Sequence, residues 1–163
     1  ADGVNGLSAP DGTNLYRTGC VGRIRVFEET DDGRYMIELR GLSRFDIVDE
    51  LEMRDGYRRI QPDYTRFTAD LLPSPEIPIE RDRLLTSLKG YFELQNISAD
   101  WDALVKTPDE RLITTLAMVC PFDPAEKQVL LESPDIAQQC KMLIGFIEST
   151  LRADNDNGNP ALN

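Results

Sequence analysis

The spacing of apolar side chains changes near the middle of the chain. Between residues 16 and 72 they fall in short alternating or β-branched runs separated by turns. From residue 80 to residue 153 they recur every three or four positions. The first pattern is typical of β-strands and the second of amphipathic helices. The sequence therefore predicts an α+β protein, with an antiparallel β-rich part followed by a helical bundle.

Two turns in the β-rich part end in glycine, at Thr30–Gly33 and at Arg54–Gly56, where a tight hairpin needs positive φ. We expect strands over residues 19–27, 35–40, 45–51 (broken near Asp49) and 57–61, with Phe67, Ala69 and Leu71 in a further one. Tyr35, Ile37 and Leu39 alternate with Met36, Glu38 and Arg40, which predicts one buried and one solvent-facing side. The expected product is a twisted sheet or small barrel. Residues 1–14 have the composition of a loop.

Prolines punctuate the second part. Pro73–Pro75 and Pro78 form a stiff linker, and helices are expected around Leu84–Phe92 and Trp101–Val105. Further helices are expected to begin at Thr107, Asp123 and Ser133, each of which precedes a proline. The predicted organisation is a β-rich subdomain over 1–75, a helical bundle over 76–153 and a disordered polar tail over 154–163.

Composition narrows the classes of partner. The 163 residues carry a net charge of -11, which opposes nucleic acid as a partner. Three widely spaced cysteines fit reduced thiols in a cytoplasmic protein. No apolar run has the roughly 20 residues needed to cross a membrane, and no signal peptide is recognisable. The glycine-rich opening at Ala1 is expected to lie inside a longer protein.

Catalytic and metal-binding patterns are absent from the sequence. The chain has no histidine, no C-x-x-C pair and no phosphate-binding glycine loop, so we expect no catalytic, metal or cofactor site. Ser87 with Lys89 is the nearest candidate dyad, although residues two apart on a helix point in different directions. The acidic cluster of Asp49, Glu50 and Glu52 is better explained as a solvated turn.

Candidate contact residues lie near the second turn. Met53, Tyr57, Tyr64 and Phe67 are proposed to present an apolar surface to an extended peptide, although simple cover for a barrel is the alternative. Arginines at 23, 25, 44 and 66 are candidates to pair with acidic residues of a bound protein.

Several segments resemble a known family. Blocks of the Lon protease N-terminal domain are similar, in the same order, to residues 19–24, 32–41 and 43–45. The helical end of that domain is similar to residues 126–132 and the long helix that follows them. The resemblance covers roughly residues 15–152. It implies a PUA-like β pseudobarrel followed by a helical bundle. In the family, this whole unit recognises unfolded or degradation-tagged proteins.

The resemblance also marks departures. The proline- and leucine-rich strand, turn and helix that open family members have no counterpart in this sequence, and neither do the ATPase and Ser-Lys protease modules. We therefore expect a non-catalytic, stand-alone recognition domain, with an open sheet edge through which a homo-oligomer can form. The alternatives are an RNA-binding PUA-like module, favoured only by fold analogy, and a cryptic hydrolase.

Overall fold

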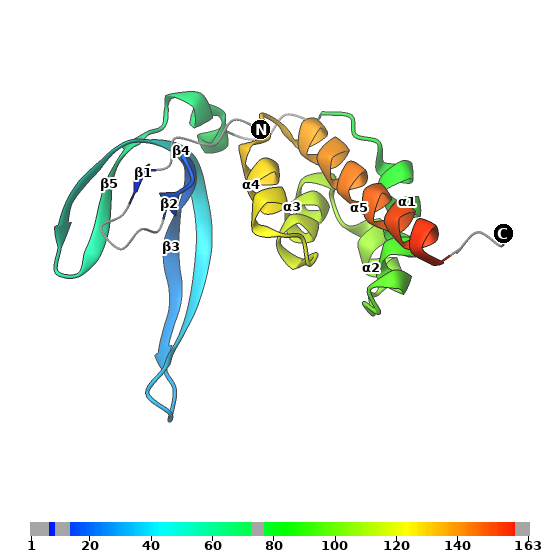
Figure 1. The fold of residues 1–163 in the computed structure, drawn as a ribbon, viewed down its shortest axis with the longest axis horizontal. Coiled ribbons are helices and arrows are strands. Elements are labelled where there is room, and N and C mark those ends of the chain that lie inside the picture. Colours follow the sequence, from blue (N-terminus) through cyan, green and yellow to red (C-terminus); the bar gives the residue numbers. More distant parts are fainter. Residues whose placement is uncertain (1–6, 9–13, 73–76, 159–163) are drawn as a thin grey trace. The chain divides into compact units, whose positions relative to one another are not determined.

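The computed structural model describes residues 7–8, 14–72 and 77–158. Contacts divide the chain into two compact units, Ala1–Pro75 and Glu76–Asn163. We call them the β unit and the helical unit. The β unit contains antiparallel strands and the helical unit contains α-helices (Figure 1). The α+β prediction is therefore confirmed.

The β unit is built on three antiparallel strands in the order β3-β4-β5. They are β3 (Thr18–Glu29), β4 (Tyr35–Arg54) and β5 (Tyr57–Asp63). Two short strands, β1 (Leu7–Ser8) and β2 (Asn14–Leu15), form a separate pair. Residues 7, 8 and 14 are therefore strand, where the sequence predicted only loop.

Both predicted turns form. Gly33 has φ +77°, and the second turn places Asp55 at +50° and Gly56 at +85°, so each chain reversal uses the left-handed backbone region. The predicted third strand is not separate, because β4 runs on from residue 40 to residue 54. The expected break near Asp49 survives only as a shift of register between Ile47 and Asp49 in the pairing of β4 with β5.

The segment around Phe67 is a short 3₁₀ helix, η1 (Thr65–Leu71), and not the predicted strand. Asp63, the last residue of β5, turns the chain before it, since its carboxylate accepts hydrogen bonds from both the Thr65 amide (2.9 Å) and the Thr65 hydroxyl (2.6 Å). An aspartate that bonds the backbone two residues on favours a turn over an extended strand.

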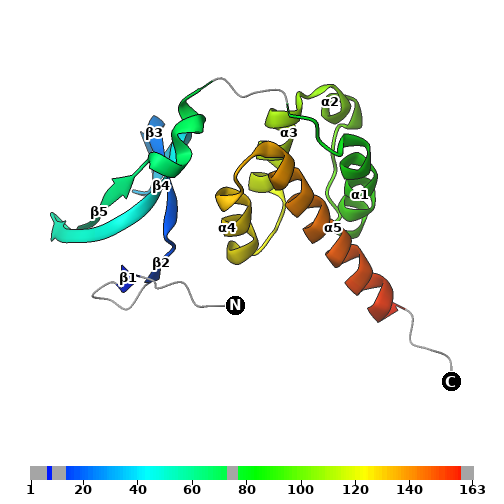
Figure 2. The ribbon, with the colours of Figure 1, turned by 90° about the horizontal axis from the view of Figure 1, so that it is seen from above.

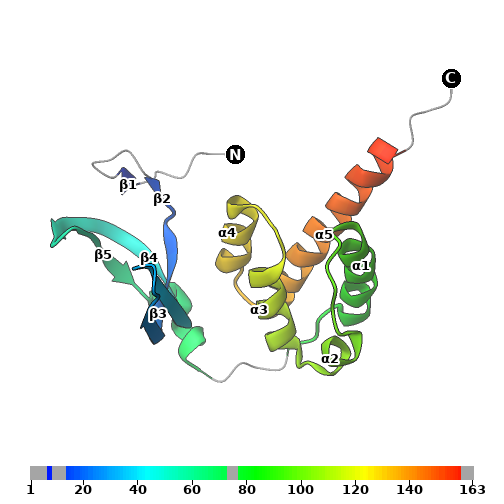
Figure 3. The same cartoon turned by 90° about the horizontal axis from the view of Figure 1, so that it is seen from below.

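The helical unit contains five helices within its described residues: α1 (Arg81–Leu94), α2 (Trp101–Lys106), α3 (Asp109–Val119), α4 (Pro124–Glu132) and α5 (Ile136–Gly158). Figures 2 and 3 show α1 lying alongside α5. Fourteen buried apolar side chains form its core, including Leu84, Leu88, Ile113, Leu143 and Ile147. None of the described helices is long and apolar enough to span a membrane.

Helix starts follow the sequence at some positions and not at others. Asp123 and Glu126 form the predicted reciprocal capping box at α4. The predicted caps at Thr107 and Ser133 are wrong, because each hydroxyl instead donates to a carbonyl of the preceding helix, at Ala103 and Val129 respectively. Asp135 accepts from the Gln138 amide and so supports the start of α5.

The predicted polar tail is helical as far as Gly158, since α5 continues beyond its last core contacts. Residues 159–163 lie outside the described part of the chain. The packed stripe before residue 152 supplies the nucleus from which the remaining turn propagates, because adding a residue to an existing helix costs far less than starting one.

The core of the helical unit makes a direct prediction. Replacing Leu143, which has no exposed surface, by alanine should lower the free energy of unfolding by about 2–5 kcal/mol through lost burial and a cavity. Met118→Ala on α3, where the side chain is 65% exposed, should change it by less than about 0.5 kcal/mol. Urea unfolding followed by the fluorescence of Trp101, the single tryptophan, measures both. Equal effects of the two substitutions would contradict the assigned core.

Candidate functional site

The β unit exposes apolar side chains that a folded sheet normally covers. Of its described residues, Phe67 is the single buried hydrophobic side chain. Residues 35–42 of β4 are exposed on both sides of the strand. The prediction that Tyr35, Ile37 and Leu39 point into a core is therefore wrong. This surface is the first candidate for a binding site.

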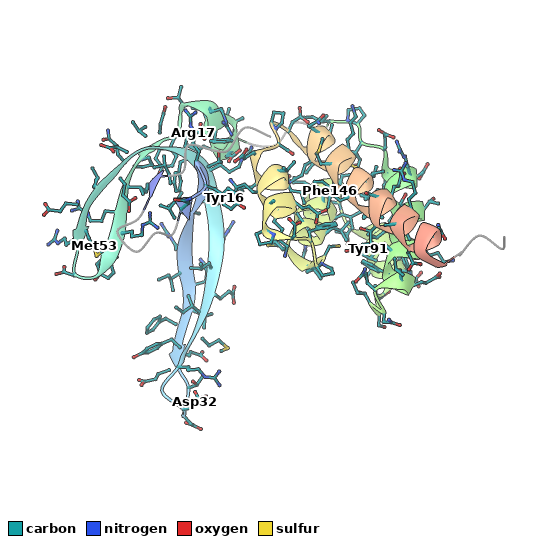
Figure 4. All side chains as sticks on the ribbon, in the orientation of Figure 1. Tyr16, Arg17, Asp32, Met53, Tyr91 and Phe146 are labelled. Atoms are coloured by element: carbon teal, nitrogen blue, oxygen red, sulfur yellow. The ribbon has the colours of Figure 1, made fainter. Side chains whose placement is uncertain are left out.

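These exposed residues belong to a two-stranded ribbon, residues 22–41, which we call the arm. It is formed by the outer part of β3, the turn at Thr30–Gly33 and the start of β4, and its tip lies at Asp32 (Figures 1 and 4). The strands β3 and β4 pair along its length, and the pairing of β4 with β5 begins only at Asp46. Within the described residues the arm therefore has no third strand beside it.

Pairing register places the apolar residues of the arm on one face. Residues opposite each other in an antiparallel pair share a face. Phe27 is opposite Ile37, and Ile24 is opposite Leu39. Tyr35 lies two positions before Ile37 on β4 and so shares its face. A register shift between Ile24 and Val26 keeps Ile24 and Phe27 on the same face although they are three residues apart. We call these five residues (Ile24, Phe27, Tyr35, Ile37 and Leu39) the arm face.

The opposite side of the arm is polar by comparison. It carries the pairs Arg23–Arg40, Val26–Glu38 and Glu28–Met36. On the arm face itself, the rings of Phe27 and Tyr35 stack with centroids 5.0 Å apart and an interplanar angle of 23°. This stack fixes the two aromatic side chains against each other and leaves at least half of each exposed. The arm is thus an amphipathic ribbon whose apolar side is open to solvent.

A second exposed apolar pair lies at the turn between β4 and β5. Met53 and Tyr57 flank this turn, and both are at least half exposed. Figure 4 places Met53 at this turn, away from Asp32 at the tip of the arm. Tyr57 begins β5 and Tyr64 follows its end, so seven residues at about 3.3 Å each hold the two tyrosines roughly 20 Å apart. The four predicted contact residues therefore do not form one patch.

Phe67 is not part of any exposed surface, because only 3% of it is accessible. Two guanidinium groups lie over its ring, with Arg44 Cζ 4.6 Å and Arg66 Cζ 4.4 Å from the ring centroid. Such cation–π contacts are stabilising when they are partly shielded from water. The expectation that Phe67 belongs to an exposed contact surface is therefore wrong, because its ring packs with Arg44 of β4 and Arg66 of η1.

Each of the two arginines beside Phe67 is neutralised by an aspartate. Asp70 accepts from Arg44 three times, from its backbone amide (2.9 Å), Nε (2.9 Å) and Nη2 (2.7 Å). Arg66 lies 3.3 Å from the Asp46 carboxylate, which also accepts from the Thr18 hydroxyl at 2.8 Å. The hydrogen bond from the Arg44 side chain lowers the pKa of Asp70 below its usual 3.8.

The four arginines proposed to contact a bound protein therefore divide into two groups. Arg44 and Arg66 are committed to internal ion pairs. Arg23 and Arg25 are exposed on the arm, and neither forms an ion pair within the described residues. Only the second pair is free to meet a partner.

The candidate reactive groups are engaged in structural contacts. Glu50 accepts from Arg58 through both oxygens, at 2.7 and 2.9 Å, and the Asp49 carboxylate bonds the Glu50 amide. Ser87 donates to Glu148, a carboxylate that also holds Arg83. Among the described residues no three His, Cys, Asp or Glu side chains come together as metal ligands.

The cysteines also favour a structural role. Burial raises the pKa of Cys120 to about 11 and also raises that of Cys140, which keeps both as neutral thiols at physiological pH. All three cysteines are free, and Cys20 is exposed on β3.

Sequence reasoning found the arm face as a pattern and misjudged its surroundings. The alternation of Tyr35, Ile37 and Leu39 predicted the shared face, and the partners Ile24 and Phe27 lie on the strand that was expected to pair with it. What the pattern lacks is any sign of whether another element covers that face.

Comparison with known proteins identifies relatives for most of the chain. The family model described as the ATP-dependent protease La (LON) substrate-binding domain matches residues 4–149. A curated relative, the Lon protease of Brevibacillus choshinensis, is 23% identical over 146 residues, which make up 88% of this chain and 18% of that protein. The chain thus spans less than a fifth of the length of this relative.

Two solved structures share the fold. One is the Lon N-terminal domain protein from Xanthomonas campestris, with a TM-score of 0.53, 19% identity and coverage of 85% of this chain and 72% of that chain. The other is the N-terminal domain of the Mycobacterium avium complex Lon protease, with a TM-score of 0.55, 18% identity and coverage of 81% and 70%.

The Arg44–Asp70 contact predicts a pH dependence. Because the pKa of Asp70 is lower in the folded chain than its usual 3.8, this contact stabilises the β unit above that value and is lost as the pH falls through the lowered one. The Arg44 amide, which donates to Asp70, should report the titration by NMR with a midpoint below 3.8. Asp70→Asn should abolish this titration, whereas Asp55→Asn at the exposed turn should leave it unchanged. A midpoint at or above 3.8 would exclude the contact.

Proposed function

Because the chain belongs to the family of ATP-dependent protease La (LON) substrate-binding domains, we propose that it is a non-catalytic module that binds unfolded or degradation-targeted proteins. The arm face is the observation that carries this proposal. It presents five large apolar side chains to solvent on one side of a ribbon. Folded client proteins bury such side chains in their own cores, whereas unfolded ones expose complementary apolar segments.

The strength of this binding follows from the area available. Complete burial of an aliphatic or aromatic side chain contributes about 1.5–3 kcal/mol, and covering the exposed half of one contributes about 1 kcal/mol. Five such side chains offset the cost of ordering an extended client segment only in part. The arm face therefore favours weak and sequence-tolerant binding, which suits a receptor for many different unfolded chains.

Backbone groups add to this surface. Within the described residues, no strand is paired with the outer edge of β3 or with residues 35–42 of β4 on the side away from β3. An extended client segment can add to such an edge by main-chain hydrogen bonds, which do not depend on its sequence. The apolar face then selects for hydrophobic side chains, and the edge supplies general affinity.

Met53 and Tyr57 form a second proposed contact, at the turn between β4 and β5. A client segment long enough to bridge the two turns of the β unit would gain from both contacts. Tyr64 packs edge-on against Phe45 with ring centroids 6.0 Å apart, so it presents less of its surface and is the weakest of the proposed contacts.

Adjacent residues on the two sides of the arm give a matched test of the proposal. Ile37→Ser on the arm face should weaken binding of a reduced and alkylated, permanently unfolded protein by about fivefold, which corresponds to about 1 kcal/mol of lost burial. Met36→Ser is the control, because Met36 is 54% exposed against 50% for Ile37 and lies on the opposite side of the same strand. Fluorescence anisotropy of a labelled unfolded protein measures both affinities.

Binding of unfolded protein is expected to depend on the arm face and not on exposed apolar side chains elsewhere on the β unit. Equal losses from Ile37→Ser and Met36→Ser would show that the arm face is not the site. Absence of any binding by the unsubstituted chain at tens of micromolar, the range expected of a weak receptor, would count against the function itself.

A further inference from the structure

The arm carries opposite charge at its two ends. Its tip, residues 28–35, holds four carboxylates, Glu28, Glu29, Asp31 and Asp32, against one arginine, Arg34. Its base, residues 22–25 and 39–41, holds three arginines, Arg23, Arg25 and Arg40, and no carboxylate. The tip is therefore acidic and the base is basic. Arg23, Arg40 and Glu28 lie on the opposite side of the arm, whereas Glu29, opposite Tyr35, lies on the arm face, and Arg25 occupies the register shift next to Ile24.

Within the part of the chain that the structure describes, most of these charges have no ionic partner. Arg34 is paired with Asp32, to which its Nε donates at 2.8 Å. Within the described residues, neither Arg25 at the base nor Glu29 at the tip forms an ion pair, and all the side chains of both groups are exposed. They are thus available to an external partner.

The two ends are far enough apart to act separately. Arg25 and Glu29 are four positions apart, which corresponds to about 13 Å along a strand. Exposed charges are screened over about 8 Å at physiological ionic strength, so each end keeps its own sign. A partner that recognises the whole arm must offer an apolar surface flanked by the same two charges in the reverse order.

We propose that this partner is a second copy of the chain, with the two arm faces packed against each other and the two arms antiparallel. A two-fold axis through the Phe27–Ile37 pair then sets the Tyr35–Glu29 pair of one copy over the Ile24–Leu39 pair of the other. Arg25 follows Ile24 at the register shift, where it has no opposing residue, so the axis brings Glu29 of each copy close to Arg25 of its partner. The same operation pairs Glu29 with Arg25 twice and buries both apolar faces.

The size of the contact fits a reversible dimer. A fully buried aromatic side chain covers about 150–250 Å², so five half-exposed side chains offer roughly 500 Å² per copy and about 1,000 Å² in total. This is close to the lower limit for a specific interface. The proposed contact uses the apolar face of the arm, whereas the sequence led us to expect an oligomer formed through a sheet edge.

Charge reversal on the 163-residue chain tests the geometry. Glu29→Arg and Arg25→Glu should each raise the dimer dissociation constant by roughly tenfold, because each places two like-charged contacts across the two-fold axis. The double variant, with the charges exchanged, should regain most of the wild-type affinity. Sedimentation equilibrium at low and high salt measures these constants, and high salt should weaken the wild-type dimer.

Mixing the two single variants guards against loss of folding as an explanation. Arg25→Glu then carries acidic groups at positions 25 and 29, and Glu29→Arg carries basic groups at both, so the mixture should form a heterodimer that is tighter than either homodimer. A wild-type chain that stays monomeric at several hundred micromolar, reversals without effect, or a mixture that does not associate would each overturn the proposal.

The dimer is separable from the proposed function. Ile37→Ser should weaken both the dimer and the binding of unfolded protein, whereas Glu29→Arg should weaken only the dimer. A monomeric wild-type chain that still binds unfolded protein would refute the dimer and leave the function standing. A chain that forms the dimer but binds no unfolded protein even at concentrations well below the dimer dissociation constant would do the reverse.

Discussion

The stack of two guanidinium groups on the Phe67 ring is the contact on which the β unit depends. A three-stranded sheet needs a covered apolar surface to be stable, and Phe67 is the single hydrophobic residue buried among the described residues of this unit. Its burial requires Arg44 and Arg66 to lose part of their hydration, which Asp70 and Asp46 compensate through ion pairs. An arginine takes this place better than an apolar residue because its planar group covers a ring face while its edge meets a carboxylate. The cluster therefore joins η1 to β4 without a conventional core.

The two units divide the apolar residues of the chain in different ways. In the helical unit the apolar stripes of α1, α3 and α5 face one another, and the polar network around Glu148 ties α1 to α5 at the surface. In the β unit most large apolar side chains face solvent. Such a surface has a cost in solubility and stability, and the proposed binding function gives it a use. The helical unit buries its apolar side chains in a core, whereas the β unit leaves most of its large apolar side chains exposed to solvent.

Local signals in the sequence predicted the features that depend on local physics. Gly33 and Gly56 marked the turns because positive φ excludes most other residues, and Asp123 with Glu126 marked the start of α4. Features that depend on competition between partners were not predictable in this way. The hydroxyls of Thr107 and Ser133 can either cap the next helix or donate to a carbonyl of the previous one. Sequence spacing alone does not show which of these two hydrogen bonds is more stable. The burial of Phe67 depends on Arg44, more than twenty residues away, and the exposure of Ile37 depends on the absence of a covering element in the described residues.

Both proposals place a partner on the same five side chains, so the two states exclude each other. A face that is occupied by a second copy is not available to a client, and the apparent affinity for clients then falls by the fraction of chains that are paired. Unfolded protein at high concentration would in turn draw the chain from the paired to the single form by mass action. The paired form would also shield an apolar surface that otherwise favours aggregation whenever clients are scarce. The charges of the arm make this shielding selective, because an antiparallel copy pairs Glu29 with Arg25 at both ends of the contact, whereas a client needs neither pair.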